Sequence, residues 1–471
     1  MRIAVLVVCC ALFLDKLVWS AQPTRTNLIF ILTDNQGAWT LGCYGNPDIR
    51  TPNIDRLARE GTKFTRALSS NPVCSPTRAT FLTGLIPSQH GVHSFLDPQY
   101  MMGPRAYNTL AEFTSLGEIL RAEGYTCGLS GKWHLGANLQ PSEGFSFWIT
   151  KPDGSTREFY DQDVIEHGQV RKEAGYTTEL WTRKGIEFIE QNKDRPFCLF
   201  LAYNGPYVLG NLMLNASRNR HAAEYRGHRF TSFPVDSMHP WQFANKQFHN
   251  QQIAMERTAC EVSGVDDGVG HIMESLERLK LDDNTLVVYT ADQGWMGGQN
   301  GIWGMGDHLR PTGAHEMMMR IPMIFRQPGT VAANKSNDLI VSNYDFLPTV
   351  LGQLGLSDKM PTSPKSPGRD FSPALREQQL DWENVAFYEM ETTRAIRIED
   401  WKYVARFPNG PFELYNMQTD PMERFNLYGQ PNTQTIRDQL AQKLTSFFEH
   451  YADSQYDLWK GGRSKAKRHT P

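Results

Sequence analysis

The feature that most constrains the fold is a set of continuous apolar segments, each ending in polar or turn-forming residues. They occupy residues 28–32, 197–201 and 286–289. Apolar runs without alternation are typical of strands buried on both faces of a parallel sheet. Helical patterns lie between them, at residues 51–61, 115–124 and 262–279. This order predicts an α/β fold with a large, mixed or parallel sheet that is flanked by helices.

The length and charge of the chain limit what it can do. Its 471 residues suffice for one large domain with an appendage. Lys and Arg total 48 against 51 for Asp and Glu, which gives a net charge of -3. Since no overall positive field is available for a polyanion, we expect no nucleic-acid partner.

The chain divides into three segments. Residues 1–21 resemble a secretory signal, with Arg2 before an apolar run and small residues at Ser20 and Ala21. We therefore expect an exported protein, periplasmic or extracellular, or lysosomal or secretory in a eukaryote. No apolar run reaches the roughly 20 residues of a bilayer span, so we expect no membrane-spanning segment. Residues 22–370 are predicted to form the main, catalytic domain.

Residues 371–471 are predicted to form a C-terminal subdomain. Short alternating segments within 387–414 favour a small antiparallel sheet. A final helix is expected to present one apolar face, made by Ile436, Leu440, Leu444, Phe447 and Tyr451. The basic tail from Lys460 is interpreted as a solvated end rather than a binding arm.

Five cysteines follow the predicted signal: Cys43, Cys74, Cys127, Cys198 and Cys260. An odd number in an oxidising compartment leaves at least one thiol spare. The four cysteines other than Cys74 could form two disulfides or none, and no spacing decides between these possibilities.

Two of the predicted strands end alike. The first runs into Asp34 and Asn35, and the last runs into Asp292 and Gln293. Because the carboxyl ends of parallel strands face the ligand crevice, these four oxygen-bearing side chains are candidate metal ligands. Such ligands suit Ca²⁺, and less well Mg²⁺, rather than zinc. The alternative is that both pairs only form strand-terminating turns.

Residues 72–78, which read PVCSPTR, suggest a second reactive element. Pro76 favours the first turn of a helix, which would place Cys74 at the positive end of the helix dipole and Arg78 one turn further on. This environment favours an anionic ligand or a reactive thiolate. The alternative is a small buried cysteine at a helix entry.

The motif at residues 72–78, with FLTG at 81–84, resembles the first signature of the type I sulfatases. Residues 124–134, GYTCGLSGKWH, resemble the second signature and depart from it only at Cys127, where Ser or Thr is usual. The segments TPNIDRLA at 51–58, ELY at 413–415 and DP at 420–421 also fit the family. The resemblance therefore covers nearly the whole chain after the predicted signal.

The resemblance implies an alkaline-phosphatase-like fold and a sulfuric ester hydrolase. It also implies that a maturation enzyme oxidises Cys74 to formylglycine, and that calcium is bound by Asp34, Asn35, Asp292 and Gln293. Many members have Asp where Asn35 stands and Asn or His where Gln293 stands; both substitutions keep an oxygen donor.

In the mechanism that the family implies, the aldehyde at position 74 hydrates to a gem-diol. One hydroxyl, oriented by the metal and Arg78, attacks sulfur and expels the alcohol. The second hydroxyl, deprotonated with help from His134, then expels sulfate. Lys132 and the cation neutralise the sulfate oxygens.

Two positions depart from the family pattern. Tyr207 stands where a His is common, and Met305, in the segment IWGM at 302–305, stands where a Lys is common. In the family these two groups bind sulfate and assist the leaving alkoxide. We therefore take Tyr207, Trp303, His308 and Arg310 as candidate substrate-binding residues. His308 and Arg310 either reach the sulfate in place of the missing Lys or serve only their loop.

The expected substrate is a sulfated small molecule or, more specifically, a sulfated carbohydrate. The weakly periodic residues 205–252 could form an insertion that shapes an extended cleft, or could be a surface excursion. Two alternatives remain open. The missing Lys and His could mark a phosphonate or phosphodiester hydrolase of the same fold. The protein could also be a non-catalytic binder of sulfated glycans, although a binder needs no modifiable Cys74.

Overall fold

A ten-stranded mixed sheet forms the centre of the computed structural model, which describes residues 25–467. In spatial order its strands are β12 (Lys335–Ser342), β2 (Thr62–Leu68), β11 (Met323–Arg326), β8 (Thr285–Ala291), β1 (Asn27–Asp34), β7 (Phe197–Pro206), β3 (Thr126–Gly131), β4 (Phe145–Thr150), β5 (Asp163–Glu166) and β6 (Gln169–Lys172). The five neighbours from β8 to β4 are parallel, whereas β11, β5 and β6 pair antiparallel. The predicted α/β class is confirmed.

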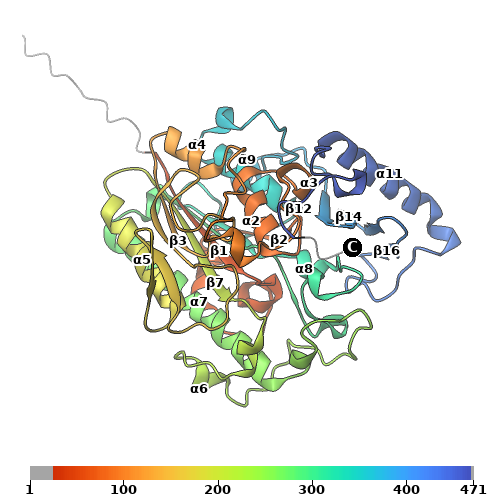
Figure 1. Cartoon of the computed structure of the whole chain (residues 1–471), viewed down its shortest axis with the longest axis horizontal. Helices are drawn as coiled ribbons and strands as arrows, with labels where there is room; N and C mark the ends of the chain where they lie inside the picture. Colours follow the sequence, from red (N-terminus) through yellow and green to blue (C-terminus); the bar gives the residue numbers. More distant parts are fainter. Residues whose placement is uncertain (1–24, 468–471) are drawn as a thin grey trace, which may run out of the picture.

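Helices cover both faces of this sheet (Figure 1). On one face lie α1 (Pro52–Arg59), α5 (Thr177–Asn192) and α7 (Gln252–Leu279), and on the other lie α2 (Cys74–Thr83), α4 (Leu116–Ala122) and α9 (Phe346–Gln353). Strand β1 shows why two cores form, because Ile29 and Ile31 pack in the first core while Leu28, Phe30 and Leu32 pack in the second. Shorter helices are α3 (Pro87–His90), α6 (Ala222–Tyr225), α8 (Glu316–Met319) and α10 (Ser372–Leu375).

The predicted helices are present, and one is longer than expected. Helix α4 begins with a capping box, in which Ser115 and Glu118 satisfy each other's backbone N–H groups. Helix α7 begins at Gln252 rather than at residue 262. Its first part contains Arg257, a charged residue that interrupts the apolar pattern but is buried and lies 2.8 Å from the Glu261 carboxylate.

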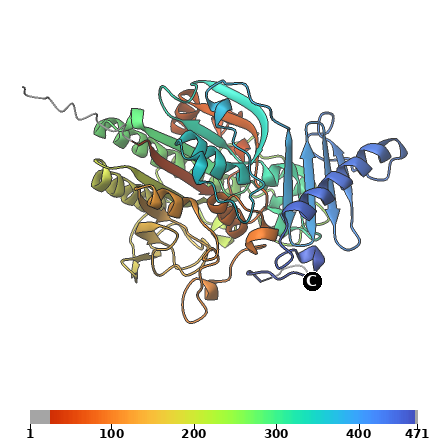
Figure 2. The same ribbon diagram turned by 90° about the horizontal axis from the view of Figure 1, so that it is seen from above.

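The C-terminal residues form a second sheet, as predicted. It contains β13 (Val385–Met390), β14 (Thr393–Ile398), β15 (Trp401–Arg406) and β16 (Glu413–Asn416), all antiparallel. Helix α11 (Gln434–Tyr451) packs along this sheet (Figure 2). Leu440, Leu444 and Phe448 are buried, and Ile436, Phe447 and Tyr451 are partly buried and pack against the same core, so the predicted apolar face is present and Phe448 adds to it. The boundary between residues 370 and 371 remains a prediction.

The described part of the basic tail is docked, which corrects the expectation of a solvated end. The Lys465 ammonium lies 2.8 Å from a Glu112 carboxylate oxygen and donates to Thr109 O. The Tyr107 hydroxyl donates to the carbonyl of Lys465. Charge complementarity with a segment far away in sequence thus fixes the tail, and composition alone does not reveal such a partner.

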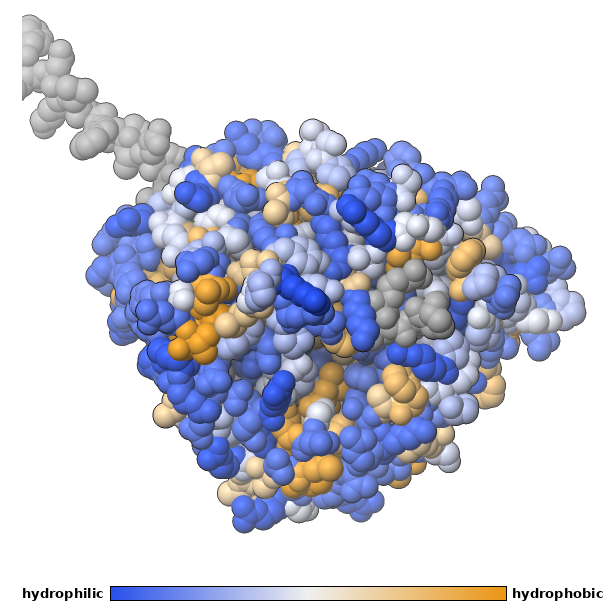
Figure 3. All heavy atoms as spheres, viewed as in Figure 1, coloured by the Kyte–Doolittle hydropathy of each residue, from blue (hydrophilic) through white to orange (hydrophobic). Residues whose placement is uncertain are grey.

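Several sequence predictions concern export and cysteine pairing. The predicted signal, residues 1–21, lies outside the described residues. Within residues 25–467 no helix has both the length and the hydropathy needed to cross a bilayer. The face seen in Figure 3 is mostly hydrophilic, with hydrophobic residues in small separate patches. All five cysteines in the described range are free thiols.

Candidate active site

The candidate site forms where several chain segments meet at the carboxyl ends of the parallel strands. Asp34 is the last residue of β1, Asp292 follows β8, and Lys132 follows β3. Cys74 is the first residue of α2. One ligand atom each from Asp34, Cys74 and Asp292 lies within 4.8 Å of the other two. The three segments that sequence analysis singled out therefore come together.

Cys74 is 4% exposed and points at the strand ends. Its thiol donates to Asp34 Oδ1 at 3.1 Å and lies 3.3 Å from Gln293 Nε2. Burial, followed by the charge of Asp34, raises the pKa of the thiol well above its ordinary value. These surroundings favour the neutral thiol of unmodified Cys74 over the thiolate.

Arg78 and Lys132 carry buried positive charges beside Cys74. The Arg78 guanidinium donates to Asp292 Oδ2 at 2.8 and 3.1 Å and to the carbonyl of Lys132. The Lys132 ammonium pairs with Asp34, and both side chains are completely buried. Burial disfavours this ammonium, but the Asp34 carboxylate outweighs burial and raises the pKa of Lys132. Both cations therefore stay charged.

The four proposed metal ligands lie next to one another in the folded protein. Asp292 Oδ1 accepts from the backbone N–H of Asn35 at 3.0 Å and from that of Gln293 at 2.9 Å. The Gln293 side-chain amide contacts Asn35 Oδ1. Burial and the nearby Asp34 charge raise the pKa of Asp292 to about 6. Two buried carboxylates that repel each other, together with two amide oxygens, fit a hard divalent cation such as Ca²⁺.

His134 is a buried, neutral imidazole at the edge of this cluster. Its Nε2 lies 3.2 Å from the carbonyl of Leu96, so Nε2 carries the hydrogen. Among the described residues Nδ1 has no hydrogen-bond partner. Burial, and then the charges of Lys132 and Arg78, lower the pKa of His134 well below its ordinary value. His134 thus offers an unoccupied proton acceptor.

Tyr207 lies over the Lys132 side chain, with the ammonium 5.3 Å from the centre of its ring. Its backbone joins the strand ends, because its N–H donates to Asp34 O and its carbonyl accepts from the Asn35 side chain. Tyr207, Asn35 and His134 all have positive φ angles, between 56° and 61°. Non-glycine residues in this region store strain, and such strain clusters at functional sites.

The hydrogen bonds of the other three candidate substrate-binding residues go to their own loops and to neighbouring backbone groups. Trp303 is completely buried, and its indole N–H donates to the carbonyl of Val208. His308 Nδ1 accepts from the backbone N–H of Met305 at 3.1 Å. Arg310 lies over the ring of Phe243 and donates to carbonyls of its own loop. Within residues 25–467 no hydrogen bond or ion pair joins them to Cys74, so their proposed contact with sulfate stays a prediction.

Two further residues lie near the candidate site: Met305, which the sequence marked as a departure from the family pattern, and Lys151, which the sequence did not mark. Met305 Sδ lies 3.6 Å from Gln293 Nε2, so the thioether faces the predicted metal ligands. Lys151 follows the last residue of β4 and is 2% exposed. The available signal was a lysine two residues after the apolar segment 147–149.

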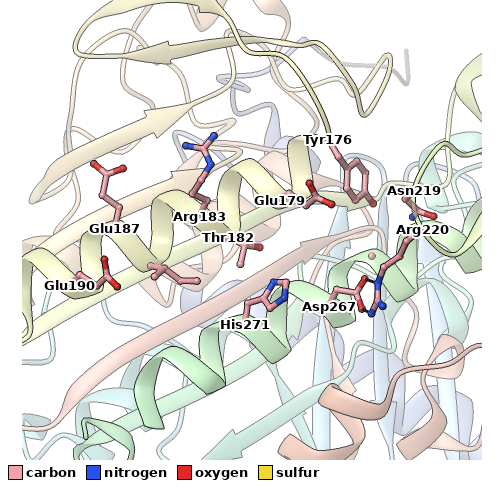
Figure 4. Close-up of a pocket in the computed structure, with 13 residues that line it drawn as sticks. Tyr176, Glu179, Thr182, Arg183, Glu187, Glu190, Asn219, Arg220, Asp267 and His271 are labelled. Atoms are coloured by element: carbon pink, nitrogen blue, oxygen red, sulfur yellow. Dashed lines mark hydrogen bonds and ion pairs between the residues drawn. The ribbon is translucent and has the colours of Figure 1, made fainter. Parts of the chain in front are cut away.

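A separate cavity of about 710 Å³ lies between α5 and α7 (Figure 4). Its lining combines charges of both signs, including Glu187, Arg183, Asp267 and His271. Arg220 and Asp267 pair across one end. The lining contains none of the site residues predicted from sequence, so this cavity is distinct from the Cys74 cluster.

Gly131 fixes the position of Lys132 at the end of β3. Its φ is +122°, and a Cβ there would lie 1.9 Å from the carbonyl oxygen of Ala202. We expect Gly131→Ala to lower the free energy of unfolding by about 2–5 kcal/mol, from left-handed strain plus overpacking. Urea unfolding would measure this loss. Gly124→Ala is the matched control, since Gly124 also has positive φ but nothing within 4 Å of its Cβ position; equal losses would show that contact with Ala202 is irrelevant.

Solved structures share this architecture. One is a protein in complex with its substrate D-glucosamine-2-N,6-O-disulfate, which superposes with a TM-score of 0.73 at 24% sequence identity. The match covers 92% of this chain and 99% of that one. The large mixed sheet and the small antiparallel sheet together correspond to the alkaline-phosphatase-like fold.

Sequence comparisons identify the family. The sulfatase family model matches residues 26–356, and the model for the C-terminal part of N-sulphoglucosamine sulphohydrolase matches residues 312–450. An N-acetylglucosamine-6-O-sulfatase of Bacteroides thetaiotaomicron is 26% identical over 94% of this chain and 90% of its own length. An N-acetylgalactosamine-6-sulfatase of Rattus norvegicus is 30% identical over 82% of this chain and 72% of its own length. The chain belongs to the sulfatase family, and it is an enzyme that hydrolyses sulfate esters.

Proposed function

We propose that this sulfatase cleaves sulfate monoesters of a sulfated carbohydrate through a formylglycine gem-diol derived from Cys74, with a calcium ion bound beside it. The observation that carries the proposal is the contact between Cys74 and the two acidic strand ends at Asp34 and Asp292. A nucleophile derived from Cys74 needs a nearby cation that neutralises the sulfate oxygens. The contact between Cys74 and the acidic strand ends supports the presence of both the nucleophile and the cation.

Asp34, Asn35, Asp292 and Gln293 would hold the calcium ion. A formylglycine would supply a hydroxyl nucleophile, and the ion would supply positive charge at the sulfate oxygens. The chain's own residues do the rest. Arg78, fixed by Asp292 and by the carbonyl of Lys132, orients the group at position 74 one helical turn away. Lys132 adds a buried positive charge, which stabilises negative charge strongly because water is excluded.

Proton transfer is assigned to His134 and Tyr207. His134 is neutral and has an unpartnered Nδ1, so it can take a hydroxyl proton from position 74. Burial raises the pKa of Tyr207, which keeps its phenol protonated beside Lys132. A protonated phenol can donate a hydrogen bond to the ester oxygen, a role that the family gives to a histidine at this position.

A carbohydrate substrate is supported by relatives whose names specify sulfated amino sugars. We expect kcat/KM on the preferred sulfated saccharide to exceed that on nitrophenyl sulfate at least about 10-fold, because contacts with the sugar add binding energy. A panel of sulfated saccharides, nitrophenyl sulfate and a nitrophenyl phosphodiester would measure these ratios. Higher kcat/KM on the phosphodiester would favour the phosphodiester alternative, and no turnover of any substrate by the matured protein would favour the glycan binder.

We also propose that the protein is exported and that a maturation enzyme oxidises Cys74. The apolar stretch after Arg2 supports export. The neutral, buried thiol supports modification, because an unmodified Cys74 would be a poor nucleophile.

A further inference from the structure

Two lysines stand side by side at the carboxyl edge of the sheet. Strands β3 and β4 are parallel, and their last register pair joins Gly131 to Thr150. The residue that follows each strand is a lysine, Lys132 after β3 and Lys151 after β4. The two lysines therefore follow paired strand ends, and the charge of Lys132 acts on Lys151. Lys132 is already part of the candidate site, so Lys151 belongs to its immediate surroundings.

Lys151 is held in place by its backbone. Its carbonyl accepts a hydrogen bond from the Asn138 side chain at 2.9 Å. The carbonyl of Asn138 in turn accepts from the Trp148 indole at 2.8 Å. Thr150, the preceding residue, accepts from the backbone N–H of Trp133 at 3.1 Å. These hydrogen bonds fix the backbone of Lys151 directly after β4.

The charges around Cys74 leave Lys151 without a partner. Arg78 pairs with Asp292, and Lys132 pairs with Asp34. Within residues 25–467 the Lys151 ammonium forms no ion pair or hydrogen bond, although the residue is only 2% exposed. Burial lowers the pKa of Lys151 to about 8, while the charge of Asp153 opposes this change and that of Lys132 adds to it. A lysine that is this little exposed and has no carboxylate partner favours an anionic ligand.

We propose that Lys151 is a substrate-binding residue that holds the sulfate group of the ester, and so supplies the cation that Met305 does not. The inference rests on the proposed function. Met305 presents a thioether to Gln293 where the family commonly has a lysine. Lys151 follows β4, which lies next to β3 in the sheet, whereas Gln293, the contact of Met305, follows β8 on the other side of β1. Its charge acts on both Lys132 and His134, which places it within electrostatic range of the residues assigned to sulfate and proton transfer.

The test compares Lys151→Met, which removes the charge, with Lys151→Arg, which keeps it. Lys172→Met, which changes an exposed lysine on β6, is the control. For Lys151→Met we expect KM and the inhibition constant of inorganic sulfate to rise roughly 10- to 100-fold, the usual effect of losing a hydrogen bond to a charged group. Lys151→Arg should stay close to wild type in both. Sulfate should raise the Tm of the wild type but not that of Lys151→Met.

Stability separates a binding role from a structural one. Since the buried charge is unpaired, the Tm of Lys151→Met without sulfate should equal or exceed that of the wild type. A variant that unfolds, or one with unchanged KM and sulfate inhibition, would overturn the proposal. So would a Lys151→Arg protein as impaired as Lys151→Met. A wild type that hydrolyses no sulfate ester would instead refute the proposed function, and this inference with it.

Discussion

Replacing Cys74 with alanine is expected to abolish sulfate ester hydrolysis, with kcat at least about 10⁴-fold below wild type. The loss is this large because the nucleophile itself is removed, and the remaining groups give only residual catalysis. Steady-state kinetics on the best saccharide substrate would measure it. The fold should persist, since Cys74 contributes one small buried side chain whose loss costs about 1–2 kcal/mol.

Cys260→Ala is the matched control, because Cys260 is also a buried, helical cysteine but lies in α7. We expect it to keep wild-type kcat. Mass spectrometry of the peptide that contains residue 74 gives a second readout, since wild type made with a maturation enzyme should show an aldehyde in place of the thiol. Full activity in Cys74→Ala would refute the assigned nucleophile.

Asp292→Asn is expected to lower kcat about 10³-fold and to remove a calcium-dependent rise in Tm. The change deletes a proposed metal ligand, and metal-ion catalysis contributes several kcal/mol to stabilisation of the transition state. It also leaves the buried Arg78 without its carboxylate partner. Thermal unfolding with added calcium or chelator would show metal binding independently of activity, and isothermal titration would give its affinity.

The control is Asp266→Asn, because Asp266 is buried but caps α1 through the backbone N–H groups of Asn53 and Ile54. It should lower Tm while preserving the response to calcium. If the Tm of wild type were insensitive to both calcium and chelator, the four oxygen-bearing residues would have to be assigned to hydrogen bonding alone.

The fold was largely predictable because its strands are buried on both faces. Apolar segments such as 28–32 need no alternation to be recognised, and helices with clear caps, such as α4, begin where their caps lie. Prediction was less accurate where charged side chains are buried in ion pairs. The docked Lys465 pairs with Glu112, which is far away in the sequence. Arg257 pairs with Glu261 four residues along α7, and the sequence shows this spacing but not that both side chains are buried.

The candidate site was predictable to a similar degree. Motifs identified Cys74, Arg78 and Lys132, and strand ends identified Asp34 and Asp292, because these residues follow directly from local patterns. Candidate substrate-binding residues that were chosen because they lie near Met305 in the sequence were predicted less well. Trp303, two residues before Met305, packs in the core. Lys151 had no motif to mark it. The role proposed for it depends on the pairing of β3 with β4, which is a property of the folded sheet.

The burial of Cys74 also dictates an order of events during biosynthesis. With 4% of its surface accessible and the thiol covered by Asp34 and Gln293, no second protein can reach the sulfur once α2 has docked on the sheet. Under the proposed chemistry, oxidation must therefore precede folding, while the nascent chain is still extended. Under this chemistry, protein that folds with an unmodified Cys74 stays inactive. It would have to unfold before the maturation enzyme could oxidise the cysteine.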